Sequence, residues 1–277
     1  MKIAQTIPEM KAFRKELAGP VGFVPTMGFL HEGHLSLVRR ARAENASVAV
    51  SIFVNPTQFG PGEDLATYPR NLERDRSFLE QEGADLVFTP SPEEMYPPGF
   101  QTWVEAEKIS ERLEGACRPG HFRGVATVVL KLFHLVGPDR AYFGQKDAQQ
   151  ALVIRRMAAD LNLDVESIVV PTVREEDGLA MSSRNVRLDP PGRRAAPILF
   201  QALSLARQLY GEGERDAERI RRRMAERIGR EPLVRIEYVS LADRDTLEEL
   251  SILDRPALAS LAAHIGPVRL IDNLLLP

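Results

Sequence analysis

The sequence of 277 residues is poor in cysteine, in aromatic residues and in lysine, and these shortages narrow its possible functions. Its only cysteine, Cys117, cannot form a disulfide within the chain, which is typical of the reducing cytoplasm, and we expect that location. One cysteine and five histidines offer no ligand set of the usual kind for structural zinc. A net charge of −3 and the lack of a basic tail argue against nucleic acid as a partner.

Long apolar runs and the two commonest nucleotide-binding motifs are also missing. No stretch approaches the length of a membrane-spanning helix and no charged-then-apolar leader is visible, so we expect no membrane partner. The absence of Gly-x-x-x-x-Gly-Lys-Ser/Thr excludes a P-loop. The absence of Gly-x-Gly-x-x-Gly after the first strand argues against a dinucleotide-dependent dehydrogenase. A hydrophobic content of 44% is that of an ordinary globular protein, and the length favours two domains.

Strand and helix patterns alternate as far as Pro171. Near-continuous apolar runs predict strands at 21–25, 48–54, 85–89, 141–143 and 165–170. Amphipathic segments predict helices at 33–44, 70–82, 122–136 and 147–161. Apolar strands separated by helices favour a parallel sheet covered on both faces, whose ligands bind beyond the carboxyl ends of the strands.

The pattern changes after Pro171. A polar loop over 172–185 precedes predicted helices near 192–210 and 214–229 and strands at 234–241, 257–264 and 267–275. We therefore predict an α/β fold in which a Rossmann-like parallel-sheet domain (1–172) is followed by a smaller α+β C-terminal domain (173–277).

The stretch 21–34, Val-Gly-Phe-Val-Pro-Thr-Met-Gly-Phe-Leu-His-Glu-Gly-His, combines a strand end, a tight turn and a helix start. Such a junction presents backbone N–H groups and the positive end of a helix to an anion. His31 and His34, three residues apart, would lie on one face of the first turn. The residues fit a phosphate site in which imidazoles replace a lysine, but by themselves they fit an exposed helix start equally well.

Two further loops carry groups suited to a small polar or anionic substrate. Asn55 and Gln58 follow the second strand as neutral hydrogen-bonding groups, although an Asn-Pro turn would also account for Asn55. Arg118, His121 and Arg123 make another helix start cationic, which fits either a lid over an anion or an ordinary charged loop.

A Gly turn and a polar linker add cations and hydroxyls. Only six lysines occur, so Lys146 at a strand–helix turn is informative, and Gln150 could reach the same crevice. Ser-Ser-Arg at 182–184 could grip a triphosphate with several donors, although such a triplet is also common in linkers.

Five motifs, taken in order, resemble the pantoate–β-alanine ligase family of the nucleotidylyltransferase superfamily, and the resemblance runs nearly from end to end. They are Pro-Thr-Met-Gly-x-Leu-His-x-Gly-His (25–34), Phe-Val-Asn-Pro-x-Gln-Phe (53–59), Tyr-Pro-Arg (68–70), Phe-Gly-x-Lys-Asp-x-Gln-Gln (143–150) and Asp-Gly-Leu-Ala-Met-Ser-Ser-Arg-Asn (177–185). The resemblance implies an enzyme that uses ATP to convert pantoate into pantoyl adenylate, releasing pyrophosphate. The amine of β-alanine then displaces AMP to give pantothenate.

Two alternatives share part of this pattern. One is a nucleotidylyltransferase that stops at an adenylylated product, and the other is a non-catalytic nucleotide-binding module. Gln58 and Gln150 favour the ligase, because they suit a hydroxy acid better than a second phosphate.

The resemblance also assigns roles to individual residues. It implies phosphate-binding, catalytic roles for His31, His34, Lys146, Ser182, Ser183 and Arg184, and it extends the ATP site to Pro25, Met27, Gly28, Gly144, Asp147, Val173 and Met181. It implies that pantoate and β-alanine contact Met27, Asn55, Gln58, Gln150, Arg118 and His121. Asp75 is the implied magnesium contact, with Arg74 before it where the family often has an acidic residue. A homodimer is expected from the family alone.

Overall fold

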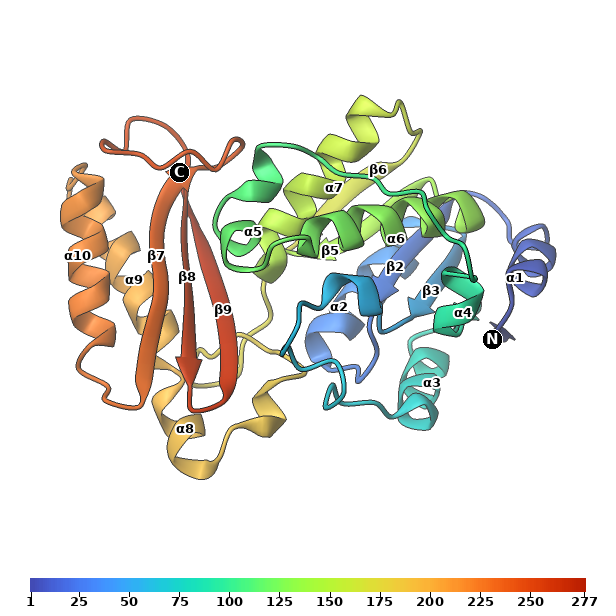
Figure 1. The fold of residues 1–277 in the computed structure, drawn as a ribbon, viewed down its shortest axis with the longest axis horizontal. Helices are drawn as coiled ribbons and strands as arrows, with labels where there is room; N and C mark the ends of the chain where they lie inside the picture. The colour runs from blue at the N-terminus through green and yellow to red at the C-terminus, as the bar shows by residue number, and fades with distance from the viewer. The chain divides into compact units, whose positions relative to one another are not determined.

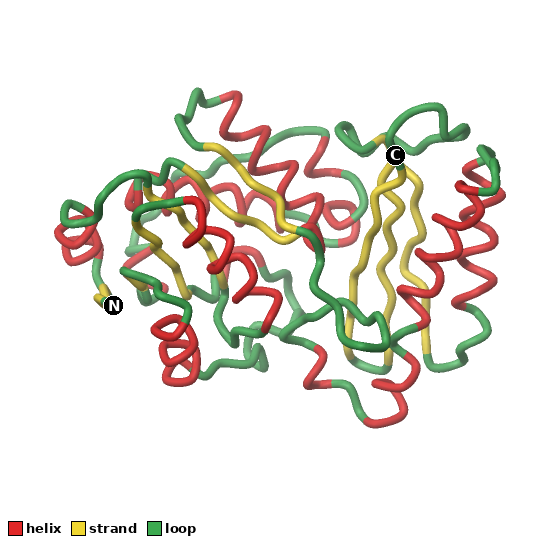
Figure 2. The backbone as a smooth tube through the Cα atoms, turned by 180° about the vertical axis from the view of Figure 1, so that it is seen from behind, coloured by secondary structure: helices red, strands yellow, loops and turns green.

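The computed structural model describes every residue from Met1 to Pro277, and the chain divides into two compact units (Figures 1 and 2). The first unit comprises Met1–Gln145 and Gln149–Pro171, and the second comprises Lys146–Ala148 and Thr172–Pro277. None of the helices combines the length and apolar character that crossing a bilayer requires.

Six parallel strands form the sheet of the first unit, in the order β1-β4-β3-β2-β5-β6. They are β1 (Lys2–Ala4), β2 (Val21–Thr26), β3 (Ser47–Ile52), β4 (Leu86–Phe88), β5 (Arg140–Gly144) and β6 (Glu166–Val170). The five strands predicted from apolar runs are confirmed. β1 was missed because three residues are too few for a periodic pattern.

Helices cover both faces of this sheet (Figure 1). The longer ones are α1 (Ile7–Arg14), α2 (Glu32–Glu44), α3 (Leu72–Gln81), α6 (His121–Val136) and α7 (Ala148–Asp160), and short turns form α4 (Pro92–Met95), α5 (Glu114–Cys117), η1 (Pro56–Gln58), η2 (Ile109–Glu111) and η3 (Gln145–Asp147). Consecutive residues of β2 enter different cores, since Phe23 packs in the cluster around α6 and Val24 in the cluster around α2. Burial on both faces accounts for the unbroken apolar sequence of the strand.

The strand order reverses between β2 and β5, which are neighbours in the sheet. β3 and β4 follow on one side of this pair, and β6 lies on the other side. Ligands of open α/β sheets bind at the carboxyl ends of the strands that flank such a reversal. The topology thus brings the loop after β2, which carries the histidines, beside the end of β5 at Gly144.

The second unit is built on an antiparallel sheet in the order β7-β8-β9. Its strands are β7 (Val234–Asp243), β8 (Ala257–Ile265) and β9 (Val268–Leu276), and its helices are η4 (Asn185–Arg187), α8 (Pro190–Ala195), α9 (Ile198–Gly211) and α10 (Ala217–Ile228). Helices α9 and α10 lie along this sheet (Figure 2), and apolar residues of both helices share one core with it. The α/β fold with a smaller α+β C-terminal part is therefore confirmed.

The single helix predicted near 192–210 is wrong in one respect, because α8 and α9 are separate. Pro197 lies between them as the N-cap of α9. A proline has no N–H with which to continue the hydrogen-bond ladder of α8, so the chain starts a new helix there.

We predict that Gly124→Ala lowers the free energy of unfolding by about 1–3 kcal/mol, as overpacking does elsewhere. A Cβ at Gly124 would lie 2.4 Å from the carbonyl oxygen of Thr57, which is backbone and cannot rotate away. Urea denaturation measures the loss. Gly211→Ala is the control, because apart from its chain neighbours and the backbone of its own helix no atom lies within 4 Å of the Cβ that it adds. Equal stabilities for the two variants would show that η1 does not pack on α6 as described.

Candidate functional site

The loop between β2 and α2 brings His31 and His34 together. Their ring centroids are 4.0 Å apart, and the backbone N–H of His31 donates to Nδ1 of His34 over 3.3 Å. Since Nδ1 accepts this bond, the hydrogen of the neutral His34 ring is on Nε2, the nitrogen suited to donate to an anion. His31 is the N-cap of α2, so the predicted helix start and the shared face are confirmed.

The carboxylate of Asp75, on α3, holds this loop in place. Its two oxygens accept the backbone N–H groups of Phe29 and Leu30 over 2.7 and 2.8 Å, and the residue is 1% exposed. Burial raises the pKa of Asp75, while these two backbone donors oppose that rise. Asp75 therefore fixes the backbone just before His31 through charge-assisted hydrogen bonds.

Gly28, within this loop, and Arg74, on α3, make close contacts that restrict the loop's conformation. Gly28 has φ +81°, and a Cβ there would lie 2.9 Å from Cγ2 of Ile52 and 3.1 Å from the Asp75 carboxylate. Only glycine suits that backbone and that space. Arg74 donates to the carbonyl of Leu30, and its guanidinium lies 4.3 Å from the ring centroid of Phe29.

Few acidic side chains near this loop are available to a magnesium ion. No cluster of three or more His, Cys, Asp or Glu side chains could hold a metal. Mg²⁺ in nucleotide sites commonly keeps several waters and binds one or two carboxylates together with substrate phosphates. Both oxygens of Asp75 already accept backbone N–H groups and the residue is 1% exposed, so its direct contact with magnesium stays a prediction.

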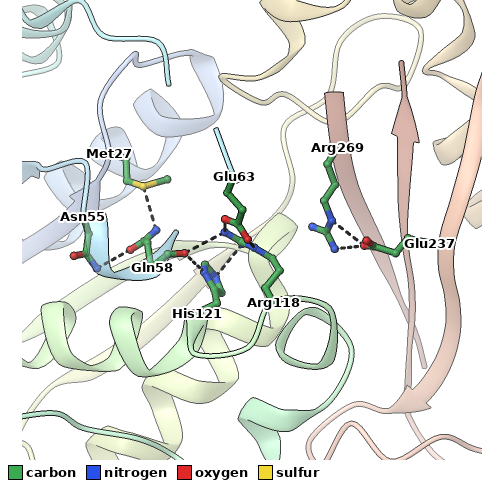
Figure 3. A network of polar contacts seen from close by, with 8 residues as sticks. All are labelled: Met27, Asn55, Gln58, Glu63, Arg118, His121, Glu237 and Arg269. Atoms are coloured by element: carbon green, nitrogen blue, oxygen red, sulfur yellow. Dashed lines mark hydrogen bonds and ion pairs between the residues drawn. The ribbon is translucent and has the colours of Figure 1, made fainter. Parts of the chain in front are cut away.

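Met27, Asn55 and Gln58 form a second polar group in the first unit (Figure 3). Asn55 Nδ2 donates to Gln58 Oε1 over 3.1 Å, and Gln58 Nε2 lies 3.1 Å from the sulfur of Met27. The Asn-Pro turn is also present, because Asn55 Oδ1 accepts from the backbone N–H and hydroxyl of Thr57. Asn55 thus stabilises the turn through its Oδ1 and orients the Gln58 amide through its Nδ2.

Gln149 and Gln150 play different parts in the fold. Gln149 is buried, donates to the carbonyls of Ile109 and Arg112 and accepts from the N–H of Glu114, so it is a structural tie. Gln150, the residue predicted for substrate, lies in the first turn of α7 and is partly exposed.

Arg118 and His121 converge on the backbone carbonyl of Gln58, from Arg118 Nη2 at 3.2 Å and His121 Nδ1 at 2.8 Å (Figure 3). The other ring nitrogen of His121 faces Arg118 Nη1 at 3.2 Å. A carbonyl only accepts and a guanidinium only donates, so the ring is neutral with its hydrogen on Nδ1. Burial, followed by the positive charge of Arg118, lowers the pKa of His121 to about 4.

Glu63 completes this network, and no motif pointed to it. Its carboxylate accepts from Arg118 Nε over 2.8 Å and from Nη2 over 2.6 Å, and it neutralises the guanidinium. The loop at Arg118 is therefore less cationic than its sequence suggests.

Of the remaining predicted ATP-binding residues, Pro25 in β2 and Gly144 in β5 belong to the first unit, and the others lie in the second. Residues 172–181 form a hairpin in which Arg174 bridges Ala180 and the N–H of Met181 donates to the carbonyl of Val173 over 3.0 Å. The hairpin leads into Ser182–Arg184, where Ser182 Oγ accepts the N–H of Arg184 over 3.2 Å.

The η3 turn supplies two more residues to the same unit. Lys146 Nζ lies 3.3 Å from a carboxylate oxygen of its neighbour Asp147, and the Lys146 side chain is 18% exposed. No motif pointed to three residues that contact this part of the second unit, namely Arg174, Asp272 and Asn273.

Comparison with known proteins gives matches along the whole chain. A sequence profile of the family described as Pantoate-beta-alanine ligase matches residues 2–275. Proteins named pantothenate synthetase from Roseiflexus sp. (strain RS-1) and Thermotoga petrophila are 60% and 59% identical, over 100% of this chain and 99% and 100% of theirs.

Solved structures agree with these relatives. A crystal structure of pantothenate synthetase from Thermus thermophilus has 52% identity and a TM-score of 0.95, covering 99% of both chains. A pantoate-beta-alanine ligase from Francisella tularensis, complexed with beta-gamma ATP and beta-alanine, has 36% identity and a TM-score of 0.83. That match covers 99% of this chain and 97% of the other.

We predict that Asp75→Asn lowers the free energy of unfolding by about 1.5–3 kcal/mol, the range for hydrogen bonds to charged groups. An amide keeps one acceptor but turns its NH₂ group toward a backbone N–H. Chemical denaturation measures the loss. Asp160→Asn, at an exposed carboxylate at the end of α7, is the matched control and should change stability little. An undiminished Asp75→Asn protein would contradict the anchoring role.

His121 gives the folded protein a pH dependence. Its pKa is about 4 in the folded chain against an ordinary 6.5, so below pH 6.5 the unfolded chain binds a proton that the folded chain does not. The contribution of neutral His121 to the free energy of unfolding is complete above pH 6.5. It falls, by up to about 3 kcal/mol, as the pH drops toward 4. His121→Asn keeps a donor near Nδ1 but does not titrate. Urea denaturation between these pH values should show a shallower loss for the variant, and parallel curves would refute the assignment.

Proposed function

Because the chain belongs to the pantoate-beta-alanine ligase family, we propose that it joins pantoate to β-alanine at the expense of ATP. The observation that carries the proposal is the family match over residues 2–275. In the first step an oxygen of the pantoate carboxylate attacks the α-phosphorus, and the bond to pyrophosphate breaks. In the second step the β-alanine nitrogen attacks the acyl carbon, the bond to AMP breaks, and the amine loses a proton.

The first step needs charge stabilisation more than it needs a base. The pantoate carboxylate is already ionised at neutral pH, so no residue has to remove a proton from it. Negative charge builds on the α-phosphoryl oxygens and on the leaving pyrophosphate. Preorganised donors aimed at these oxygens therefore supply most of the catalysis.

The proposed phosphate ligands supply such donors. They are His31 and His34 in the first unit and Lys146, Ser182, Ser183 and Arg184 in the second, with Pro25, Met27, Gly28, Gly144, Asp147, Val173 and Met181 around the nucleotide. The Nε2–H tautomer of His34 supports its part, because that nitrogen donates. Bound magnesium would neutralise phosphate charge, and Asp75 is the carboxylate proposed to contact it.

Pantoate is proposed to bind Gln58, Asn55, Met27 and Gln150. The mutual hydrogen bond of Asn55 and Gln58 supports this, since it holds a neutral amide in one orientation within a buried setting. A neutral donor can orient a hydroxy acid without forming a strong ion pair with the attacking carboxylate. Direct contact of substrate with Arg118 or His121 stays a prediction, because both side chains already bind the Gln58 carbonyl.

The family suggests two further properties. We propose a homodimer in the cytoplasm, supported by the resemblance and by the single cysteine. Light scattering of the purified protein tests the dimer, and a mass of 30.9 kDa would contradict it.

The reaction predicts pantoate-dependent ATP–pyrophosphate exchange, followed by AMP release when β-alanine is added. Exchange without pantoate would overturn the ligase proposal. Exchange with pantoate, but no AMP release on adding β-alanine, would support a nucleotidylyltransferase that stops at the adenylate.

For the phosphate ligands, we predict that His34→Ala and Lys146→Ala each slow exchange by about 10²–10³-fold, the usual effect of losing one such donor. Both variants should keep their circular dichroism spectrum and melting temperature. His134→Ala and Lys11→Ala change exposed residues of the same types and should exchange at the normal rate. Near-normal exchange by either site variant would disprove its assignment.

A further inference from the structure

We propose that Asp272 and Asn273, adjacent residues on β9, are positioning residues that hold the phosphate-binding groups of the second unit. One side chain binds the turn that carries Lys146, and the other binds the hairpin that leads to Ser182–Arg184. The inference rests on the proposed function of those groups. Neither residue belongs to a motif or touches a reacting atom, so each would act through the residues that it holds.

Asn273 holds the backbone of Lys146. Its Nδ2 donates to the Lys146 carbonyl over 2.8 Å, across 127 positions of sequence, and the residue is 5% exposed. A lysine ammonium sits on a flexible four-carbon stem, so its position depends on where the backbone starts that stem. Fixing the Lys146 peptide therefore narrows the volume that Nζ can visit.

Asp272 holds the hairpin through Arg174. The two side chains form a bidentate pair with distances of 2.6 and 3.0 Å, and Asp272 is 3% exposed. Arg174 Nη1 also donates to the carbonyl of Gly178 over 3.0 Å, at the tip of the hairpin. The guanidinium carbon lies over the Phe200 ring, 4.0 Å from its centroid.

The turn at Gly178 depends on the same neighbours. Gly178 has φ +90°, and a Cβ there would lie 2.3 Å from the Phe200 ring. The hairpin can thus lie against Phe200 and Arg174 only with glycine at its tip. This packing and the Asp272 pair together fix the segment that runs into Met181 and Ser182.

The interactions of Asp272 and of Asn273 are connected to each other on β9. The backbone N–H of Asn273 donates to Asp272 Oδ1 over 2.8 Å, and the Asn273 carbonyl lies 3.4 Å from Arg174 Nη2. The backbone of Lys146 and the hairpin are therefore both held by two adjacent residues of β9. Burial raises the pKa of Asp272, and the charge of Arg174 opposes that rise.

A gain in folding stability is a weak explanation for the buried pair of Arg174 and Asp272. Removing two charges from water costs about as much as their attraction returns, and apolar replacements of buried pairs are often neutral or stabilising. Preorganisation is a better reason, because donors that stabilise a transition state must already be in place when charge develops. At metal sites, altering the outer residues that orient the ligands commonly changes affinity or activity by about 10–100-fold, and we expect an effect of the same size here.

The test measures ATP–pyrophosphate exchange by Asn273→Ala, with ATP varied at saturating pantoate and pantoate varied at saturating ATP. We expect kcat/KM for ATP to fall about 10–100-fold, with KM for pantoate unchanged. Ser260→Ala is the matched control. Ser260 is the buried β8 residue directly opposite Asn273, its hydroxyl has no hydrogen-bond partner, and exchange should stay normal. If Asn273→Ala fails to fold, Asn273→Leu keeps the side-chain volume without the donor.

A double variant separates positioning from general damage. Residues that act as a unit show non-additive losses, so Asn273→Ala should cause little further loss in Lys146→Ala. Arg174→Lys keeps the charge but not the bidentate geometry, and it should also lower kcat/KM for ATP while sparing KM for pantoate. In an Arg174→Ala background, Asp272→Asn should add little.

The outcomes are distinct from those that test the ligase reaction. If ATP–pyrophosphate exchange by the wild-type protein does not depend on pantoate, the proposed function is rejected, whatever the kinetics of Asn273→Ala. Pantoate-dependent wild-type exchange, with normal ATP kinetics in the folded Asn273→Ala protein, rejects positioning alone. A lower melting temperature without a change in kcat/KM for ATP, or a fully additive double variant, also shows that Asn273 is merely structural.

Discussion

The buried carboxylate of Asp75 is the interaction on which the histidine loop depends. Without it, the N–H groups of Phe29 and Leu30 would need other acceptors at the point where β2 turns into α2. With it, the loop is fixed at the reversal of the sheet, and α2 starts so that the rings of His31 and His34 lie side by side, tilted by 35°. An acceptor with two oxygens can serve two consecutive donors, which a single carbonyl could not do with the same geometry.

The same principle recurs in other parts of the protein. Glu63, Arg118 and His121 hold the carbonyl of Gln58, while Asp272 and Arg174 hold the hairpin of the second unit. In each case a charged or polar side chain, directly or through a second side chain, binds the backbone of a segment that carries or leads to a proposed ligand. Several of these anchors lie on helices or strands, as Asp75 does on α3 and Asp272 on β9, whereas most of the proposed ligands lie on loops.

Prediction from sequence succeeded where a signal repeats along the chain. The strands at 21–25 and 141–143 were found because burial on both faces leaves them continuously apolar. It failed at β1, which is too short for a pattern, and at Pro197, which divides one apolar periodicity into two helices. Glu63, Asp272 and Asn273 gave no signal, because their partners are 55, 98 and 127 positions away.

The sequence by itself determined the class of fold, the family and the chemical type of the proposed ligands, since periodicity and motifs are local properties of the chain. Only the tertiary structure decided which neighbours those ligands have. It showed that Asn55 orients Gln58, that His121 is neutral and that Arg118 is balanced by Glu63. Charge state and orientation depend on burial and on hydrogen-bond partners, and both are set by segments that meet only when the chain folds.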